Sequence, residues 1–153
     1  MTKPEDYTLE QFLSEMKAII EANPDNINPV NTLSEGNCVY EAPGLIIDGV
    51  IQPKRHCVIG KFLYTIGLLD KLEVNDHEER VGLKIGPDKH GHEPILPNAN
   101  EVLTNLGFEY EIAEVAKKMQ VRADNLFRDS RYKKDKTAYG WIKLLDYPEL
   151  RFN

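Results

Sequence analysis

The sequence predicts an α+β fold, a mainly helical single domain of four to five helices with a small antiparallel β-hairpin or three-stranded sheet. Three observations predict it. Apolar residues recur at helical spacing in several segments, and the pair Asp48-Gly49 separates two short β-rich runs. The length of 153 residues, 41% of them hydrophobic, fits one globular domain, 1–153, that can bury a core without a metal or a disulfide.

Residues 8–22 carry the first helical pattern. Their apolar residues fall on one stripe, namely Leu9, Phe12, Leu13, Met16, Ile19 and Ile20. Thr8 and Gln11 have the spacing of a capping box, in which the hydroxyl accepts from a first-turn amide and the glutamine reaches back. Asn23-Pro24 ends the helix, because a residue before proline disfavours the helical region.

Residues 38–55 are predicted to be extended. The runs 45–47 and 50–52 flank Asp48-Gly49, which is typical of a two-residue hairpin turn, and residues 38–41 supply a further short strand in the three-stranded alternative. The stretch "HCVIGKFLYTIG" then predicts a helix that begins after Cys57. It ends at Gly67, which suits the left-handed position past a helix end.

The C-terminal half begins with a long polar loop excursion at 73–97, with one short strand expected at 81–85. Three helical segments follow: one from an Asn98 cap to Gly107, one over 110–126, and one that contains Trp141 between a Thr137 cap and Pro148. "RDSRYKKDK", 128–136, is predicted to be a basic polar linker. The expected core consists of Phe12, Leu13, Met16, Ile20, Cys57, Ile59, Phe62, Leu63, Ile66, Leu103, Leu106, Ile112, Val115, Ala116, Met119, Trp141 and Leu145.

Charge and composition narrow the classes of function. The net charge of -6 opposes non-specific binding to a phosphate backbone. Two cysteines, Cys38 and Cys57, are too few for a disulfide framework, and the N-terminal residues lack the apolar core of a signal peptide. No window reaches the 18 apolar residues that a spanning helix needs. We therefore expect a cytoplasmic protein with no membrane association and no cofactor.

Cys57 and His56 form the candidate catalytic pair. A thiol at a helix N-terminus beside Arg55 and His56 favours the nucleophilic thiolate. A Cys-His enzyme, however, needs the imidazole poised over the sulfur, which consecutive residues at a helix start do not generally provide. The alternative is a small buried residue of the core, which we favour because free cysteine is among the most buried residue types. Cys38 can lie nearby, so that the two thiols form a redox pair or half of a zinc site, or are simply neighbouring core thiols, which we favour.

His90, His92 and Glu93 are the candidate metal ligands. Two histidines and a carboxylate can make a three-ligand zinc site, and His77 is a further histidine in the same segment. The loop around them is polar and rich in glycine, so nothing in the sequence fixes the orientation of the imidazole rings. We therefore favour solvated loop histidines over a metal site.

The basic segment 128–141 is the candidate nucleic-acid interface. Basic and aromatic side chains alternate in it and can bind single-stranded nucleic acid; the candidates are Arg128, Arg131, Tyr132, Lys133 and Lys134. Asp129 and Asp135 dilute this patch, and the chain as a whole is acidic. A solvated linker is the favoured interpretation.

The segments "NCVYEA", "HCVIGKFLYTIGL" and "MQVRADN", followed by Trp141, resemble a pattern in small uncharacterised proteins of bacteriophages and actinobacteria. In that pattern a Cys-x-Tyr segment precedes a Cys-Ile-Val-Gly helix. Here Pro53 lies four residues before Cys57 rather than two, and 73–97 and 128–136 look inserted. The resemblance implies an accessory protein of a phage or mobile element and transfers no functional residues.

Three functional hypotheses follow. The first is a non-enzymatic phage-type accessory protein that binds and modulates a partner protein of the host, favoured because the sequence contains no complete catalytic constellation. The second is a small enzyme or a ligand- or metal-binding protein that uses Cys57 and His56, or His90 and His92. The third is a nucleic-acid-binding protein that uses 128–141. The sequence defines neither the partner nor the oligomeric state.

Overall fold

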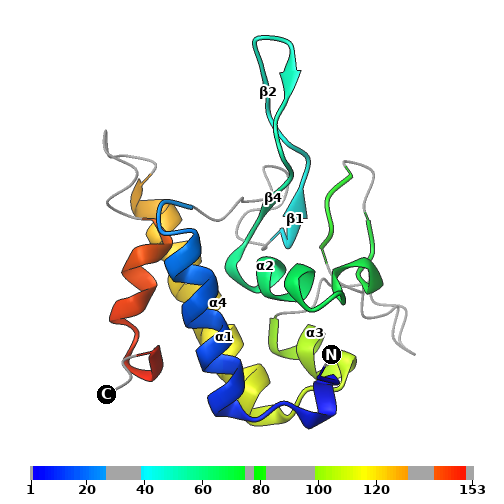
Figure 1. Ribbon diagram of the computed structural model, residues 1–153, viewed down its shortest axis with the longest axis vertical. Helices are drawn as coiled ribbons and strands as arrows, with labels where there is room; N and C mark the ends of the chain where they lie inside the picture. Colours follow the sequence, from blue (N-terminus) through cyan, green and yellow to red (C-terminus); the bar gives the residue numbers. More distant parts are fainter. Residues whose placement is uncertain (1, 27–38, 75–77, 82–98, 131–139, 151–153) are drawn as a thin grey trace, which may run out of the picture.

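The computed structural model describes residues 2–26, 39–74, 78–81, 99–130 and 140–150, with the backbone alone at 126–130 (Figure 1). The fold class predicted from the sequence is confirmed. The described residues form a mainly helical α+β structure in which two pairs of short antiparallel strands accompany the helices. None of its helices combines the length and the apolar character needed to cross a membrane.

The first helix, α1, spans Leu9–Ala22, as predicted. Its N-cap is Thr8, whose hydroxyl accepts the backbone N–H of Gln11 at 3.1 Å. The second half of the predicted capping box is wrong. The Gln11 amide donates to the hydroxyl of Thr2 at 3.1 Å and does not return to the Thr8 backbone, because the N-terminal residues fold back over the first turn.

Helices α2 (Val58–Thr65) and α3 (Ala99–Leu106) both end at the predicted glycines. Gly67 and Gly107 have φ angles of 76° and 107°. In each case the next residue closes the turn, because the N–H of Leu68 donates to the Leu63 carbonyl at 2.9 Å and that of Phe108 to Leu103 at 3.0 Å. The prediction of glycine-terminated helices is therefore confirmed at both positions. Asn98, the predicted cap of the second helix, lies outside the described residues.

Helix α4 spans Tyr110–Ser130 and is longer than the predicted helix over 110–126. Residues 128–130, assigned to the linker from the sequence, continue the helix. No glycine or proline occurs between 110 and 130 to stop it, and charge alone does not end a helix. Its buried stripe of Ile112, Ala116, Met119 and Ala123 matches the predicted period.

The last predicted helix is present as two 3₁₀ helices, η4 (Trp141–Asp146) and η5 (Pro148–Leu150). The N–H groups of Trp141 and Ile142 donate to the carbonyls of Asn26 and Pro24 at 2.8 and 2.9 Å. These bonds to the loop after α1 fix the start of η4 at a Gly140 cap. The segment with Trp141 ends directly before Pro148, as predicted, because the residue before a proline disfavours the helical region, and Pro148 then begins η5.

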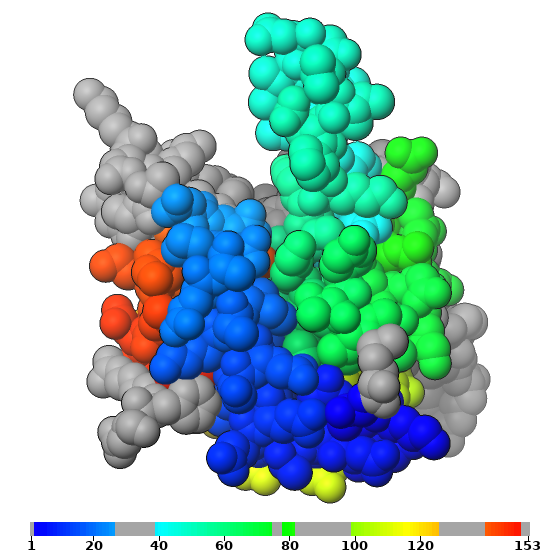
Figure 2. All heavy atoms as spheres, in the orientation of Figure 1, coloured from blue at the N-terminus to red at the C-terminus, as the bar shows by residue number. Residues whose placement is uncertain are grey.

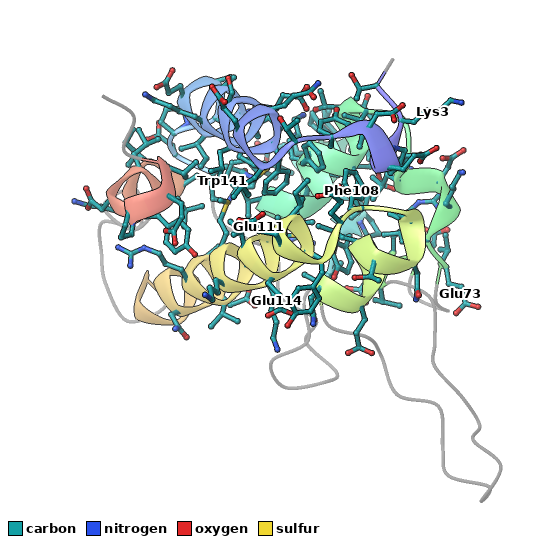
Figure 3. The ribbon with its side chains drawn as sticks, turned by 90° about the horizontal axis from the view of Figure 1, so that it is seen from below. Lys3, Glu73, Phe108, Glu111, Glu114 and Trp141 are labelled. Atoms are coloured by element: carbon teal, nitrogen blue, oxygen red, sulfur yellow. The ribbon has the colours of Figure 1, made fainter. Side chains whose placement is uncertain are left out.

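The core lies between α1, α2, α4 and η4, and Phe108 and Trp141 both point into it (Figure 3). The Phe62 ring packs edge-on against Phe12, with centroids 5.0 Å apart. Every residue of the predicted core is buried except Ile66, Leu106, Val115 and Leu145, which are partly buried and pack against it. Two shorter 3₁₀ segments complete the described helices: η1 (Pro4–Asp6) precedes α1, and η2 (Leu69–Lys71) follows α2.

The strands form one long hairpin that projects from the helical body. β1 (Glu41–Ala42) pairs with β4 (Arg55–His56), and β2 (Ile46–Ile47) pairs with β3 (Val50–Ile51). Both pairs follow the same register, so the predicted hairpin around Asp48-Gly49 is confirmed and extends to residue 56. Arg80 adds isolated bridges to Glu41 and Val74. Of the predicted strand 81–85, only Val81 lies within the described residues.

We expect Gly60→Ala to destabilise the protein, because a Cβ at this position would overlap the backbone carbonyl oxygen of Tyr40. An overpacked core contact costs about 1–3 kcal/mol, more when backbone must move. Urea unfolding followed by the fluorescence of buried Trp141 would measure the loss. Ser14→Ala, at an exposed position of α1, is the control and should leave stability equal or slightly higher. A Gly60→Ala protein as stable as the wild type would contradict this close approach.

Candidate functional site

The hairpin of residues 41–56 stands out from the helical body along most of its length (Figures 1 and 2). Its turn is formed by Asp48 and Gly49, with φ angles of 51° and 78°. Two positive φ values at the central positions define the hairpin turn whose twist matches that of the flanking strands. Glycine and aspartate tolerate this conformation, so the local sequence determines where the chain reverses.

The tip of the hairpin is apolar and exposed. Its members, which we call the apolar tip, are Leu45 (53% exposed), Ile46 (72%), Ile47 (52%), Val50 (60%) and Ile51 (75%). Successive side chains on a strand point to opposite faces, so the pair Ile46–Ile51 lies on one face and the pair Ile47–Val50 on the other. Both faces of this two-stranded ribbon therefore present aliphatic side chains to solvent.

The edges of the hairpin offer few main-chain groups to another strand. The Gln52 N–H donates to the Leu45 carbonyl at 2.8 Å, so the alternating pattern turns the N–H groups of Ile46 and Ile51 outward. Pro43 and Pro53 flank the tip and have no N–H to donate. Edge prolines oppose extension of a sheet by a further strand. The side chains of the apolar tip, and not its edges, are the surface available for recognition.

A buried carboxylate holds the root of the hairpin. Glu41 is 7% exposed, and its carboxylate lies 2.9 Å from His56 Nε2 and 3.5 Å from both Lys54 Nζ and Arg80 Nε. The backbone repeats the connection, because the N–H of Tyr40 donates to the Arg80 carbonyl at 2.8 Å and that of Arg80 to the Glu41 carbonyl at 2.9 Å. Three segments distant in sequence are thus joined at one point.

The protonation states at the root follow from these contacts. Burial alone would raise the pKa of Glu41, but the hydrogen bond from His56 and the charge of Lys54 lower it below its usual value. Burial lowers the pKa of His56, and this outweighs the opposing effect of Glu41. At neutral pH the carboxylate is therefore charged and the imidazole neutral. Because an ionised carboxylate only accepts, His56 donates its Nε2 proton to Glu41.

Cys57 is a structural cap and has no exposed surface. It is the N-cap of α2, and its Sγ accepts the backbone N–H of Gly60 at 3.2 Å. The His56 ring is hydrogen-bonded to Glu41 and lies against the Tyr64 ring, with centroids 5.1 Å apart and the two planes inclined at 39°. The two candidate catalytic residues are adjacent in sequence but engage different partners, so the expected buried role of Cys57 is confirmed. Its potential neighbour Cys38 lies outside the described residues.

The other residues singled out in the sequence are not placed by the structure. His77, His90, His92 and Glu93 lie outside the described residues, as do 131–139 with Arg131, Tyr132, Lys133 and Lys134. Arg128 falls in the last turns of α4, where only the backbone is described. Among the side chains that the structure does describe, no group of three or more metal-ligating residues comes together.

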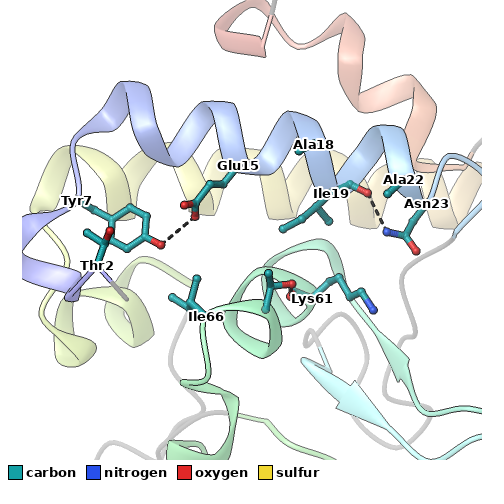
Figure 4. Close-up of a pocket in the computed structure, with 10 residues that line it drawn as sticks. Thr2, Tyr7, Glu15, Ala18, Ile19, Ala22, Asn23, Lys61 and Ile66 are labelled. Carbon is teal, nitrogen blue, oxygen red and sulfur yellow. Dashed lines mark hydrogen bonds between the residues drawn. The ribbon is translucent and has the colours of Figure 1, made fainter.

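A surface groove of about 590 Å³ lies between α1 and α2 (Figure 4). At one end the Tyr7 hydroxyl donates to Glu15 at 2.9 Å, and Lys61 lies at the other end, with Ile19 and Ile66 between them. Burial, with the hydrogen bond and charge of Glu15, raises the pKa of Tyr7, so the phenol stays protonated. Tyr7 and Glu15 already satisfy one another. The groove thus offers less to a ligand than the hairpin offers to a partner.

We expect Cys57 to be protected from thiol reagents in the folded protein, because its sulfur is buried and bonded to Gly60. In a Cys38→Ser protein, the rate of reaction with a disulfide reagent should be lower than in urea by a factor on the order of 100 or more, since reaction requires local opening. Absorbance of the released thiol gives the rate. Equal rates in folded and unfolded protein would show an accessible nucleophile and contradict the assignment as a cap.

We expect stability to fall in acid because of the pair at the hairpin root. Folding lowers both pKa values, so the stabilisation is present above the unfolded-state values of 6.5 for His56 and 4.5 for Glu41. It is lost as the pH falls through the lower folded-state values. Urea unfolding between pH 4 and 8 would show the decline. His56→Gln keeps a hydrogen-bond donor toward Glu41 and should weaken the dependence of stability on pH below pH 6.5. An unchanged dependence of stability on pH would exclude His56 as the source of the decline.

The sequence carried a signal for the hairpin but none for its root. Glu41 and Arg80 are 39 residues apart, and neither has a motif around it that indicates the other. Comparison with known proteins adds no relative: no family model, no curated protein and no solved structure matches the chain. Function must therefore be inferred from the hairpin and the residues that hold it.

Proposed function

We propose that this chain is a non-enzymatic accessory protein that binds another protein by inserting the apolar tip of its hairpin. The observation that carries the proposal is the exposure of aliphatic side chains on both faces of a projecting ribbon. Monomeric soluble proteins rarely expose contiguous apolar surface unless it is an interaction site. The phage-type, host-directed part of the role rests on the resemblance of the sequence segments alone.

The composition of the tip supports this interpretation. A run without polar alternation, such as "LIIDGVI", is typical of a strand that is covered on both faces. Here both faces meet solvent, so the pattern fits a surface that becomes covered on binding. The root also supports binding, because the buried contacts of Glu41 hold the base of the hairpin in place before a partner binds and so reduce the entropy lost on binding.

The alternative functions have less support from the described residues. A Cys57 nucleophile would need access to substrate, and the sulfur is buried beneath the start of α2. A nucleic-acid interface through 128–141 would use basic and aromatic side chains that for the most part lie outside the described residues, and the exposed aliphatic tip supplies neither cations nor stacking aromatics. Protein binding is the function that uses this feature.

We expect replacement of the four tip residues to abolish capture of a partner while leaving the fold intact. The variant Ile46→Thr/Ile47→Thr/Val50→Thr/Ile51→Thr keeps β-branched residues in the strands and removes the apolar surface. Immobilised wild-type and variant proteins are compared by quantitative mass spectrometry of the proteins retained from a cell lysate. Specific partners should be retained by the wild type and lost with the variant.

The control is Tyr110→Thr/Val121→Thr, which removes two exposed hydrophobic residues of α4 away from the hairpin. It should retain the same partners as the wild type. A photo-crosslinking residue at position 46 provides a second measurement, since it should label the retained protein directly. Identical retention by wild type and four-threonine variant, with no crosslink, would reject the proposed function.

A further inference from the structure

We infer that the partner presents a cleft with two apolar walls, hydrogen-bond donors at its floor and carboxylates at its mouth. This inference rests on the proposed function and names the kind of protein surface that the hairpin fits. It follows from the order of side chains along the ribbon, which is aliphatic at the tip, acidic at the turn and basic at the root.

The cleft of the partner needs two apolar walls because the hairpin has two apolar faces. A flat partner surface would cover either the Ile46–Ile51 face or the Ile47–Val50 face and leave the other exposed. Only a cleft covers both pairs at once. The apolar tip spans three residues on the first strand, 45–47, so the apolar part of the cleft is about 10 Å deep at 3.4 Å per residue.

The floor of the cleft must accept a negative charge. Asp48 occupies the turn and is exposed, so it enters the cleft first. Burying an isolated carboxylate is costly, and hydrogen-bond donors or a cation must therefore face it. Backbone N–H groups at a helix N-terminus or an arginine side chain would serve.

The mouth of the cleft meets the basic side of the hairpin root. Arg55 is exposed on β4 and Lys54 directly before it, and Lys61 follows on α2 with its ammonium 5.2 Å from the Tyr64 ring. Lys54 and Lys61 both lie close enough to His56 for their charges to affect its pKa. On this side of the root, cations gather in a chain whose net charge is -6. Carboxylates at the mouth would complement them.

Two other occupants fit the tip less well. A lipid bilayer would have to accept Asp48 at the deepest point of insertion, where a carboxylate costs about 2.5–3.5 kcal/mol. A second copy that stacks its hairpin on the first would cover one face of each ribbon and leave the opposite faces exposed. Extension of the strands between copies is opposed by Pro43 and Pro53.

The experiment measures the affinity of the protein that crosslinks at position 46 for separate variants of the two faces. Ile46→Thr/Ile51→Thr alters one face and Ile47→Thr/Val50→Thr the other. Each should raise the Kd about tenfold or more, since each removes two buried aliphatic contacts. If only one variant weakens binding, the partner contacts one face and the two-walled cleft is rejected, although the proposed function stands.

The mouth is tested by Arg55→Glu/Lys61→Glu, which leaves Lys54 in place beside the carboxylate of Glu41. At 50 mM salt this variant should bind about fivefold to tenfold more weakly than the wild type, and the difference should shrink to less than about twofold at 500 mM salt. Lys118→Glu/Lys143→Glu changes the net charge equally at exposed positions of α4 and η4, and it should bind like the wild type. Equal or tighter binding by Arg55→Glu/Lys61→Glu would reject an acidic mouth.

The other occupants are separate outcomes. The protein should not co-sediment with vesicles of phosphatidylcholine, alone or with one-fifth phosphatidylglycerol. If it does, and the four-threonine variant does not, the apolar tip binds a lipid surface and the inference of a protein cleft is rejected. Light scattering after gel filtration should give the same mass for wild type and four-threonine variant. A dimer that the variant loses would instead assign the tip to a second copy. If the wild type retains no protein that the four-threonine variant loses, the proposed function itself is rejected.

Discussion

The buried carboxylate of Glu41 is the interaction on which the position of the hairpin depends. It joins β1 to His56 and Lys54 on the returning strand and to Arg80 in a distant segment. Removal of one partner from a buried charge is far more costly than the net contribution of the pair, because the remaining charge stays desolvated. The root is therefore favourable only when all of these segments are in place, and the base of the hairpin forms together with the helical body.

Local features of the fold were predictable from the sequence, and contacts between distant segments were not. Asp48-Gly49, Gly67 and Gly107 specify backbone conformations that few other residues adopt, so the turn and two helix ends could be located. The start of η4 depends on carbonyls at Pro24 and Asn26, more than 100 residues earlier. Nothing near Trp141 encodes that contact. The greater length of α4 has a different, local origin: basic charge was taken to begin a linker at 128, although no residue there stops a helix.

The same distinction applies to the candidate site, where local features were predictable and features that depend on the whole fold were not. The hairpin itself followed from the turn signal, and burial of Cys57 followed from the general preference of free cysteine for buried positions. The exposure of both ribbon faces was not predictable, because a short aliphatic run without alternation normally indicates a strand buried on both sides. Whether neighbours cover it is a property of the whole fold. The root was missed for a related reason, since a buried Glu41 is recognisable only when its partners His56, Lys54 and Arg80 are known.

The magnitudes show why a positioned hairpin matters for binding. Full burial of one aliphatic side chain contributes about 1.5–3 kcal/mol, so the five tip residues, roughly 60% exposed on average, can contribute about 4.5–9 kcal/mol. Association costs on the order of 4–15 kcal/mol in lost translational and rotational freedom. The apolar tip alone therefore supports weak binding at best. A tight complex requires a ribbon already held at its root by Glu41, so that little conformational entropy is lost, and additional contacts at the basic side of the root. The contacts of Glu41 at the root therefore contribute to the affinity without touching the partner, because they hold the hairpin in its binding position.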